Sequence, residues 1–256
     1  MGETLIERGE YLVEGPAACG NCHTAPEPGA PRYGGWVIDE SPVFVARPPN
    51  ISPGSRVAGW SDAELSRAIR EGIRPDGTLI GPPMPIELYR HLSDSDLAAI
   101  VAYVRTVPAV DTTTEPSEYS FPLPTSYGPP VGHVADIPRE VTVEYGEYLA
   151  GPVAHCMECH SMTEGRPDMA NNLGGGGEPF KGPWGISIAA NLTSHPDALA
   201  QYSDKEVATM ITTGVRPGGT PMNPPMGYRY YANMTPEDVQ AIILYLRTLP
   251  PIATGG

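Results

Sequence analysis

Two stretches of sequence decide the fold of this 256-residue chain, CGNCH at residues 19–23 and CMECH at residues 156–160. Together they contain all four cysteines, so none is left for a disulfide. Two thiols about one helical turn apart can form thioethers with the two vinyl groups of one haem, and the histidine that follows is then placed to ligate the iron. The pattern therefore predicts two covalently bound haems c, held by Cys19, Cys22 and His23 in the first copy and by Cys156, Cys159 and His160 in the second.

Two other uses of paired cysteines fit the pattern less well. A thioredoxin-like dithiol needs only one Cys-x-x-Cys and has no use for the histidines that follow. A zinc site could combine both pairs, but they stand 137 residues apart, in what look like separate domains. Haem attachment explains both cysteines and the histidine of each copy and is favoured over the dithiol and zinc sites.

The second half of the chain repeats the first. Residues 8–12 (RGEYL) and 145–149 (YGEYL) each begin eleven residues before the first cysteine of a copy. Further on, residues 60–108 align with residues 202–250 without a gap, and 20 of these 49 positions are identical. Self-similarity of this extent indicates a duplicated domain.

A proline-rich stretch separates the two copies. It contains Thr and Ser besides proline and shows little hydrophobic periodicity, which is typical of an extended connector with polyproline character. We therefore expect a first haem domain over residues 1–109, a connector over residues 110–140 and a second haem domain over residues 141–256. Such a connector is expected to fix the separation of the domains more than a Gly/Ser linker would.

Helix signals dominate each copy, and strand signals are weak. Capping boxes at residues 61–64 and 203–206 predict helices over residues 62–72 and 204–214, each ending at a glycine. A last helix begins after Ser93 in the first copy and after Thr235 in the second, with apolar residues at helical spacing. Each half is therefore expected to be a small all-α unit.

One methionine is common to the two halves: Met84 aligns with Met226, and each follows two prolines. Two prolines stiffen the loop, which would hold a weak thioether ligand at little entropic cost. We therefore expect the axial pairs His23/Met84 and His160/Met226. Met222, four residues before Met226, is the rival in the second half.

The remaining histidines and two further methionines are expected to have structural roles. None of these histidines has a counterpart in the other half, which favours surface or hydrogen-bonding roles for His91, His133, His155 and His195. Met210 and Met234 align with Ala and Leu and are expected to be packing residues.

Two pairs of equivalent polar residues are expected to support the loops. Asn50 and Asn191 begin Asn-x-Ser/Thr sequences at near-equivalent positions, which favours a structural hydrogen bond over glycosylation. Arg74 and Arg216, each followed by proline, are expected to stabilise turns, and pairing with a haem propionate is the alternative.

The charge of the chain argues against nucleic-acid binding, and its hydropathy argues against a membrane-spanning helix. Thirty acidic residues against sixteen basic ones give a net charge of −14, which disfavours nucleic-acid binding and favours partners with basic patches. No apolar run approaches the roughly 18 residues that a membrane helix needs. The expectation is a soluble protein, with no membrane span in this chain.

Each half resembles a class I cytochrome c: a Gly-x-Tyr-Leu helix, Cys-x-x-Cys-His, a long loop, Pro-Pro-Met and a C-terminal helix. Phrases such as NIS at residues 50–52, AIREG at 68–72 and PMP at 83–85 are similar to the cytochrome c subunits of bacterial alcohol and aldehyde dehydrogenases. The resemblance implies that the first and last helices of each half cross at a Gly–aromatic contact, for which Gly9 with Tyr103 and Gly146 with Tyr245 are the candidates.

The resemblance also implies a location and partners. It implies a periplasmic protein that takes electrons from a dehydrogenase and passes them to another cytochrome, a quinone or an oxidase, with the signal peptide already removed. Those subunits commonly carry three haem motifs, and this chain has two. Either it is a shorter relative, or a third domain or an anchor has been removed.

Electron transfer is the function expected from these features, since His/Met ligation fills both axial positions of each iron. A dihaem peroxidase is the alternative, and it would need one haem that lacks a distal ligand. Both halves retain Pro-Pro-Met, which argues against it. A subunit that mainly positions a catalytic partner is a third alternative.

Overall fold

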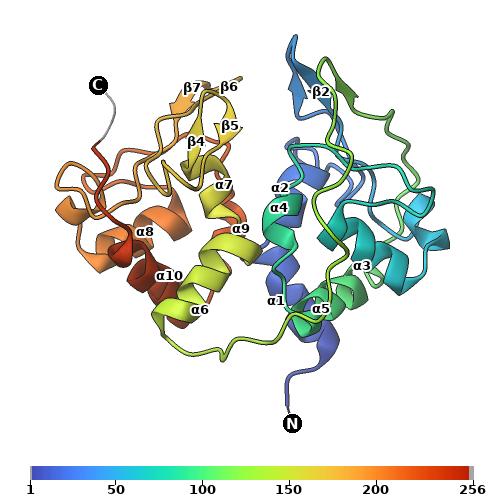
Figure 1. Cartoon of the computed structure of the whole chain (residues 1–256), viewed down its shortest axis with the longest axis horizontal. Helices are drawn as coiled ribbons and strands as arrows, with labels where there is room; N and C mark the ends of the chain where they lie inside the picture. The colour runs from blue at the N-terminus through green and yellow to red at the C-terminus, as the bar shows by residue number, and fades with distance from the viewer. Residues whose placement is uncertain (1, 254–256) are drawn as a thin grey trace. The chain divides into compact units, whose positions relative to one another are not determined.

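The computed structural model describes residues 2–253 and divides into two units, the first ending at Asp136 and the second beginning at Ile137 (Figure 1). The outer ends of the expected domains, residues 1 and 254–256, lie outside the described residues. Most of the segment expected to be a connector, up to residue 136, belongs to the first unit.

Helices are the main regular elements of the first unit. In chain order its elements are α1 (Leu5–Glu14), α2 (Cys19–His23), β1 (Asp39–Glu40), β2 (Phe44–Ala46), the 3₁₀-helix η1 (Arg56–Gly59), α3 (Asp62–Glu71), α4 (Ile86–Tyr89), α5 (Asp94–Val104) and β3 (Glu118–Tyr119). Its core lies between α1 and α5 and is made of fully or almost fully buried side chains such as Leu12, Val13 and Ile100.

The second unit repeats this order with additions. Its elements are α6 (Val143–Tyr148), the short π-helix η2 (Leu149–Val153), α7 (Cys156–His160), β4 (Met162–Thr163), β5 (Arg166–Pro167), β6 (Pro179–Gly182), β7 (Gly185–Ile188), the 3₁₀-helix η3 (Leu199–Gln201), α8 (Asp204–Thr213), α9 (Tyr228–Tyr231) and α10 (Pro236–Thr248). Here the core lies between α6 and α10, around Leu149, Ile242 and Ile243. No helix within residues 2–253 is long and apolar enough to cross a bilayer.

The predicted helix starts and stops are confirmed. Ser61 and Ser203 accept hydrogen bonds from the backbone N–H three residues on, and the glutamate there bonds back, so both capping boxes are complete. Both helices end at a glycine in the left-handed conformation, Gly72 and Gly214, each with φ of 67°. This conformation is costly for residues with a Cβ atom, which explains why glycine stands at both ends.

The predicted contacts between first and last helices are also confirmed. A Cβ atom added at Gly9 would stand 2.7 Å from the Cβ of Tyr103, and one added at Gly146 would stand 3.0 Å from the Cβ of Tyr245. Only glycine lets the helix backbones approach this closely. The same crossing therefore sets the frame of both units.

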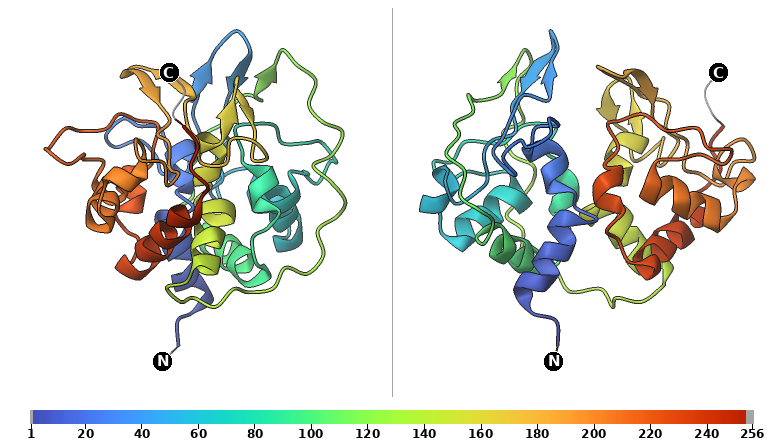
Figure 2. Two further views of the ribbon diagram at one scale, coloured as in Figure 1. Left: turned by 60° about the vertical axis from the view of Figure 1, so that its left-hand side comes forward. Right: turned by 180° about the vertical axis from the view of Figure 1, so that it is seen from behind.

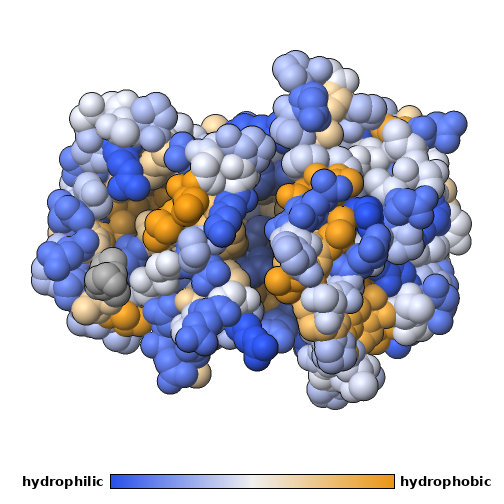
Figure 3. Space-filling model, turned by 90° about the horizontal axis from the view of Figure 1, so that it is seen from above, coloured by the Kyte–Doolittle hydropathy of each residue, from blue (hydrophilic) through white to orange (hydrophobic). Residues whose placement is uncertain are grey.

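Strands are present as well, in three small antiparallel sheets that the sequence did not predict: β1–β2–β3, β4–β5 and β6–β7 (Figure 2). They occupy the Gly- and Pro-rich segments after each Cys-x-x-Cys-His copy, and β3 comes from the expected connector. The chain is therefore helix-rich and not purely helical. Isoleucines 186 and 188 of β7 are more than half exposed, and hydrophobic side chains are visible at the surface in Figure 3.

Candidate haem sites

Each Cys-x-x-Cys-His copy forms a helix of five residues. Ala18 precedes α2 and His155 precedes α7, and both adopt the left-handed conformation, with φ of 45° and 42°. This sharp entry lets the chain turn from the preceding helix into the pentapeptide. No disulfide joins any of the four cysteines, and within each copy the two thiols and the histidine project from one short helix.

The two histidines have the same kind of hydrogen-bond partner, a main-chain carbonyl of the loop that follows. Nδ1 of His23 lies 2.8 Å from the carbonyl oxygen of Pro49, and Nδ1 of His160 lies 2.7 Å from that of Ala190. A carbonyl can only accept, so Nδ1 carries the proton and donates, and Nε2 keeps its lone pair. Histidines that ligate metals are typically oriented in this way. Sequence reasoning missed both carbonyl partners, because every residue has a main-chain carbonyl and nothing in the side chain marks it.

The environment of both imidazoles favours the neutral form. Burial lowers the pKa of His23 and of His160, and the hydrogen bond to the backbone opposes this shift in part. A neutral imidazole is the form that binds a metal.

Main-chain bonds hold the loop after each pentapeptide against it. The N–H of Gly35 donates to the carbonyl of His23, and the N–H of Gly176 donates to that of His160, both at 2.9 Å. In the first unit the indole N–H of Trp36 also donates to the carbonyl of Cys22 at 2.8 Å. The end of each pentapeptide helix is therefore fixed from the same side.

The burial of Cys19 and Cys156 argues against the dithiol alternative. Burial raises the pKa of the Cys19 thiol to about 12, with Cys22 adding to the effect, and burial raises that of Cys156 to about 12 as well. Reactive dithiols instead need a lowered pKa. Within residues 2–253 no three His, Cys, Asp or Glu side chains gather as a metal-binding group.

The two predicted methionine ligands occupy equivalent places. Met84 lies in the turn before α4, and its carbonyl accepts from the N–H of Ile86 at 2.8 Å; Met226 lies before α9, and its carbonyl accepts from Tyr228 at 3.0 Å. Both side chains are half-buried. The rival Met222 donates its N–H to Gly214, as Ile80 does to Gly72 in the first unit, so its backbone has the role of a residue that is not methionine there.

Asn50, Asn191 and Arg74 have the structural roles that were expected of them. Asn50 donates to the carbonyl of Val110 and Asn191 to that of Ile252, both at 2.7 Å, which fixes the chain after the last helix in each unit. Arg74 donates to the carbonyl of Leu79 at 2.5 Å, within its own turn. Met210 and Met234 are buried, as expected of packing residues.

The residues of both sites fit a covalently attached haem c. Each offers two cysteine thiols about one helical turn apart and a neutral imidazole whose Nε2 keeps its lone pair. Cys19, Cys22 and His23 would hold one haem, and Cys156, Cys159 and His160 the other. Both copies of the duplicated domain have this arrangement, so a chance occurrence of the motif does not explain it.

Comparison with known proteins agrees with this geometry. The family model described as "Cytochrome c" matches residues 6–108 and again residues 143–250. The fructose dehydrogenase cytochrome subunit of Gluconobacter japonicus is 29% identical over 269 residues, which cover 98% of this chain and 54% of that protein. The cytochrome c subunit of the quinone-dependent alcohol dehydrogenase of Gluconobacter oxydans is 28% identical, with 99% and 56% covered.

A further relative is closer in length. A diheme c-type cytochrome of Cereibacter sphaeroides is 29% identical over 266 residues, which cover 96% of this chain and 86% of that protein. The chain spans a little over half the length of the two dehydrogenase subunits and most of the length of this diheme cytochrome.

Proposed function

Because the chain belongs to the cytochrome c family, with one domain of that family in each half, we propose that it carries electrons from a dehydrogenase to a downstream respiratory acceptor in the periplasm. Two covalently bound haems c and a role in electron transfer follow from the family and from the diheme relative. The donor, the acceptor and the compartment are the proposed part.

The repeated histidine geometry carries the proposal. In both units an imidazole donates through Nδ1 to a loop carbonyl, at 2.8 and 2.7 Å, and so keeps Nε2 for a metal. A bound haem supplies an iron that gains and loses one electron. The chain orients the imidazole and attaches the porphyrin, and its cysteines are used in that attachment.

Methionine as the second axial ligand completes the proposed sites. Met84 and Met226 stand in equivalent turns, and the pairs His23/Met84 and His160/Met226 would fill both axial positions. A thioether opposite histidine raises the reduction potential of a haem. Sites filled in this way exchange electrons and leave no position for substrate, which favours electron transfer over the peroxidase alternative.

A dehydrogenase partner is supported by the relatives and by charge. Two of the similar proteins are named as cytochrome subunits of dehydrogenases. The net charge of −14 favours docking to a surface with basic patches. Two haems in one chain would let it take electrons at one domain and release them at the other.

Rapid mixing tests the proposal against the peroxidase alternative. The reduced holoprotein is mixed with an oxidised soluble c-type cytochrome, and the half-reduced holoprotein is separately mixed with hydrogen peroxide. We expect complete oxidation of both haems by the cytochrome and no turnover of peroxide. Sustained peroxide consumption by the half-reduced protein would overturn the proposal.

A further inference from the structure

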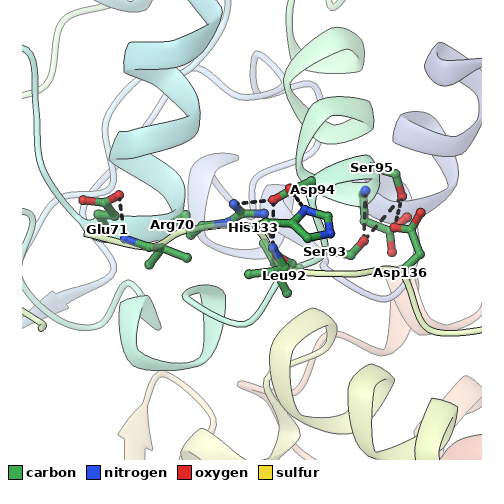
Figure 4. Close-up of polar contacts among 11 residues, drawn as sticks. Arg70, Glu71, Leu92, Ser93, Asp94, Ser95, His133 and Asp136 are labelled. Atoms are coloured by element: carbon green, nitrogen blue, oxygen red, sulfur yellow. Dashed lines mark hydrogen bonds and ion pairs between the residues drawn. The ribbon is translucent and has the colours of Figure 1, made fainter. Parts of the chain in front are cut away.

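The segment after α5 packs along the first unit as a strap, which we define as residues 113–136. Near its start, β3 pairs with β2, with Tyr119 opposite Phe44. At its far end, His133 Nδ1 lies 2.6 Å from the carboxylate of Asp94, which also accepts from Arg70 at 2.7 Å (Figure 4). Both ends of the strap are therefore fixed to the body of the first unit.

Between these ends the strap bonds the loop that carries Met84. The hydroxyl of Tyr119 donates to the carbonyl of Pro82 at 2.9 Å, and the hydroxyl of Tyr127 donates to the carbonyl of Ile80 at 2.7 Å. Both acceptors lie within four residues of Met84. Two tyrosines from outside the loop thus hold its main chain in place.

The loop that carries Met84 has a glycine where the strap packs against it. Gly81 is buried, and a Cβ atom there would stand 2.6 Å from the ring of Tyr119 and 2.8 Å from Leu123 of the strap. Any larger residue at position 81 would push the strap away. Glycine at this position therefore belongs to the contact with the strap.

The second unit has a different arrangement at the equivalent loop. Asn223 stands where the first unit has Gly81, and it is exposed, as are Pro224 and Pro225. The prolines before Met84 are half-buried. Ile86 of α4 and Tyr127 of the strap both lie over Gly72, each 3.0 Å from a Cβ added there. Over Gly214 lies Tyr228, the residue that aligns with Ile86, with its ring 2.8 Å from an added Cβ. The loop before Met226 is thus more open than that before Met84.

We propose that Tyr119 and Tyr127 are positioning residues for Met84, and that an added ligand displaces the thioether of Met84 from its haem less readily than that of Met226. This inference rests on the proposed methionine ligation. An external ligand reaches the iron only when the methionine loop moves away. In the first unit that movement breaks two tyrosine hydrogen bonds and uncovers Gly81, whereas in the second unit the loop is already exposed.

Titration of the oxidised holoprotein with imidazole tests this inference. Binding is followed by loss of the weak red absorption band of sulfur–iron ligation, and Met84→Ala and Met226→Ala show which step belongs to which haem. In the unmodified chain we expect imidazole to bind the second haem at the lower concentration. Tyr119→Phe with Tyr127→Phe removes both hydroxyls and keeps both rings, so the variant should fold.

The double variant should strengthen imidazole binding at the first haem by about three- to tenfold per hydroxyl removed, and leave the second haem unchanged. Tyr228→Phe is the matched control in the second unit, since it removes a hydroxyl from the ring that covers Gly214, and it should change neither step. The tyrosines act through the loop only, so the positions of the absorption bands before imidazole is added should not change.

Two results would overturn the inference and leave the proposed function standing. In one, the double variant binds imidazole at the first haem at the same concentration as the unmodified chain. In the other, binding at both haems shifts equally, which would indicate a general loss of stability. Absence of the red band, or a band unaffected by Met84→Ala, would instead remove Met84 as a ligand. In that case the proposed ligation fails, and the positioning role of the tyrosines fails with it.

Discussion

Gly9 of α1 lies so close to the main chain of α5 that a Cβ atom on it would stand 2.0 Å from the carbonyl oxygen of Ala99. The equivalent distance in the second unit, from Gly146 to the carbonyl oxygen of Ala241, is 1.9 Å. In each unit the helix before the haem-binding pentapeptide therefore packs in direct backbone contact with the last helix.

Replacing Gly9 with alanine should therefore destabilise the first unit. The added methyl group meets backbone atoms that cannot rotate away, and overpacking of this kind costs about 1–3 kcal/mol or more. Denaturant unfolding of the holoprotein measures the loss. Gly59→Ala is the control, because a Cβ atom there has no neighbour within 4 Å. Equal stabilities of the two variants would contradict the close crossing.

The buried ion pair between Arg8 and Asp96 should be sensitive to the loss of either charge. The two side chains are 6% and 4% exposed and form two hydrogen bonds, of 2.8 and 2.9 Å. Asp96→Asn leaves the guanidinium charge buried beside a neutral group, which we expect to cost about 3–5 kcal/mol.

The exposed pair of Arg105 and Asp62 provides the control for that prediction. Asp62 is 78% exposed and makes the same kind of contact at 3.1 Å. Asp62→Asn should cost less than about 1 kcal/mol, since water screens the pair. The unfolding midpoints of both variants measure these losses of stability. A loss for Asp96→Asn as small as that for Asp62→Asn would show that burial does not determine the strength of the pair.

Acid should weaken the attachment of the strap at Asp94. The hydrogen bond from His133, and then that from Arg70, lower the pKa of Asp94 from 3.8 to about 2 in the folded protein. A carboxyl with a lowered pKa contributes stability above its unfolded pKa, and this contribution is lost as the pH falls through the folded value. Asp94 should thus contribute fully at pH 5 and progressively less from about pH 4 to pH 2.

Asp94→Asn checks this prediction by comparison with the unmodified protein across the same pH range. The variant should be less stable at pH 5, and the difference should shrink as the pH approaches 2. Urea midpoints at several pH values give the measurement. A stability difference that is constant over this range would show that the carboxylate does not carry the effect.

Salt should slow electron exchange with basic partners. The net charge of −14 steers a positively charged protein toward this surface, and ions screen that attraction over about 10 Å at 0.1 M. The second-order rate with a basic cytochrome should fall as ionic strength rises, and the rate with an acidic one should increase. Rates that are insensitive to salt with both partners would exclude electrostatic steering.

Much of the site could be predicted from sequence because its chemistry lies in side chains at fixed spacing. Cys-x-x-Cys-His places thiols and imidazole on one short helix wherever it folds. The duplication singles out Met84 and Met226 from nine methionines as the expected second ligands, and this ligation stays a prediction. The capping boxes are likewise local signals, whereas the glycines at the helix crossings were expected from the resemblance to class I cytochromes c; the structure contains both.

The missing parts depend on backbone atoms and on distant segments. Pro49 and Ala190 orient the histidines through carbonyls, which no residue type marks. Strands β2 and β3 are two or three residues long and pair across more than seventy residues, so neither has a periodic pattern of its own. The packing of the proline-rich segment could not be predicted either, because it also depends on distant segments. The hydroxyls of Tyr119 and Tyr127 come within hydrogen-bonding distance of their acceptors only when the first unit has folded.

A potentiometric titration of the holoprotein, followed in the visible spectrum, tests the central claim most directly, that each half holds a haem between a histidine and a methionine. We predict two one-electron waves at clearly positive potentials, with Met84→Ala lowering one wave and Met226→Ala the other. A wave at strongly negative potential, or a high-spin spectrum in the unmodified protein, would contradict the claim.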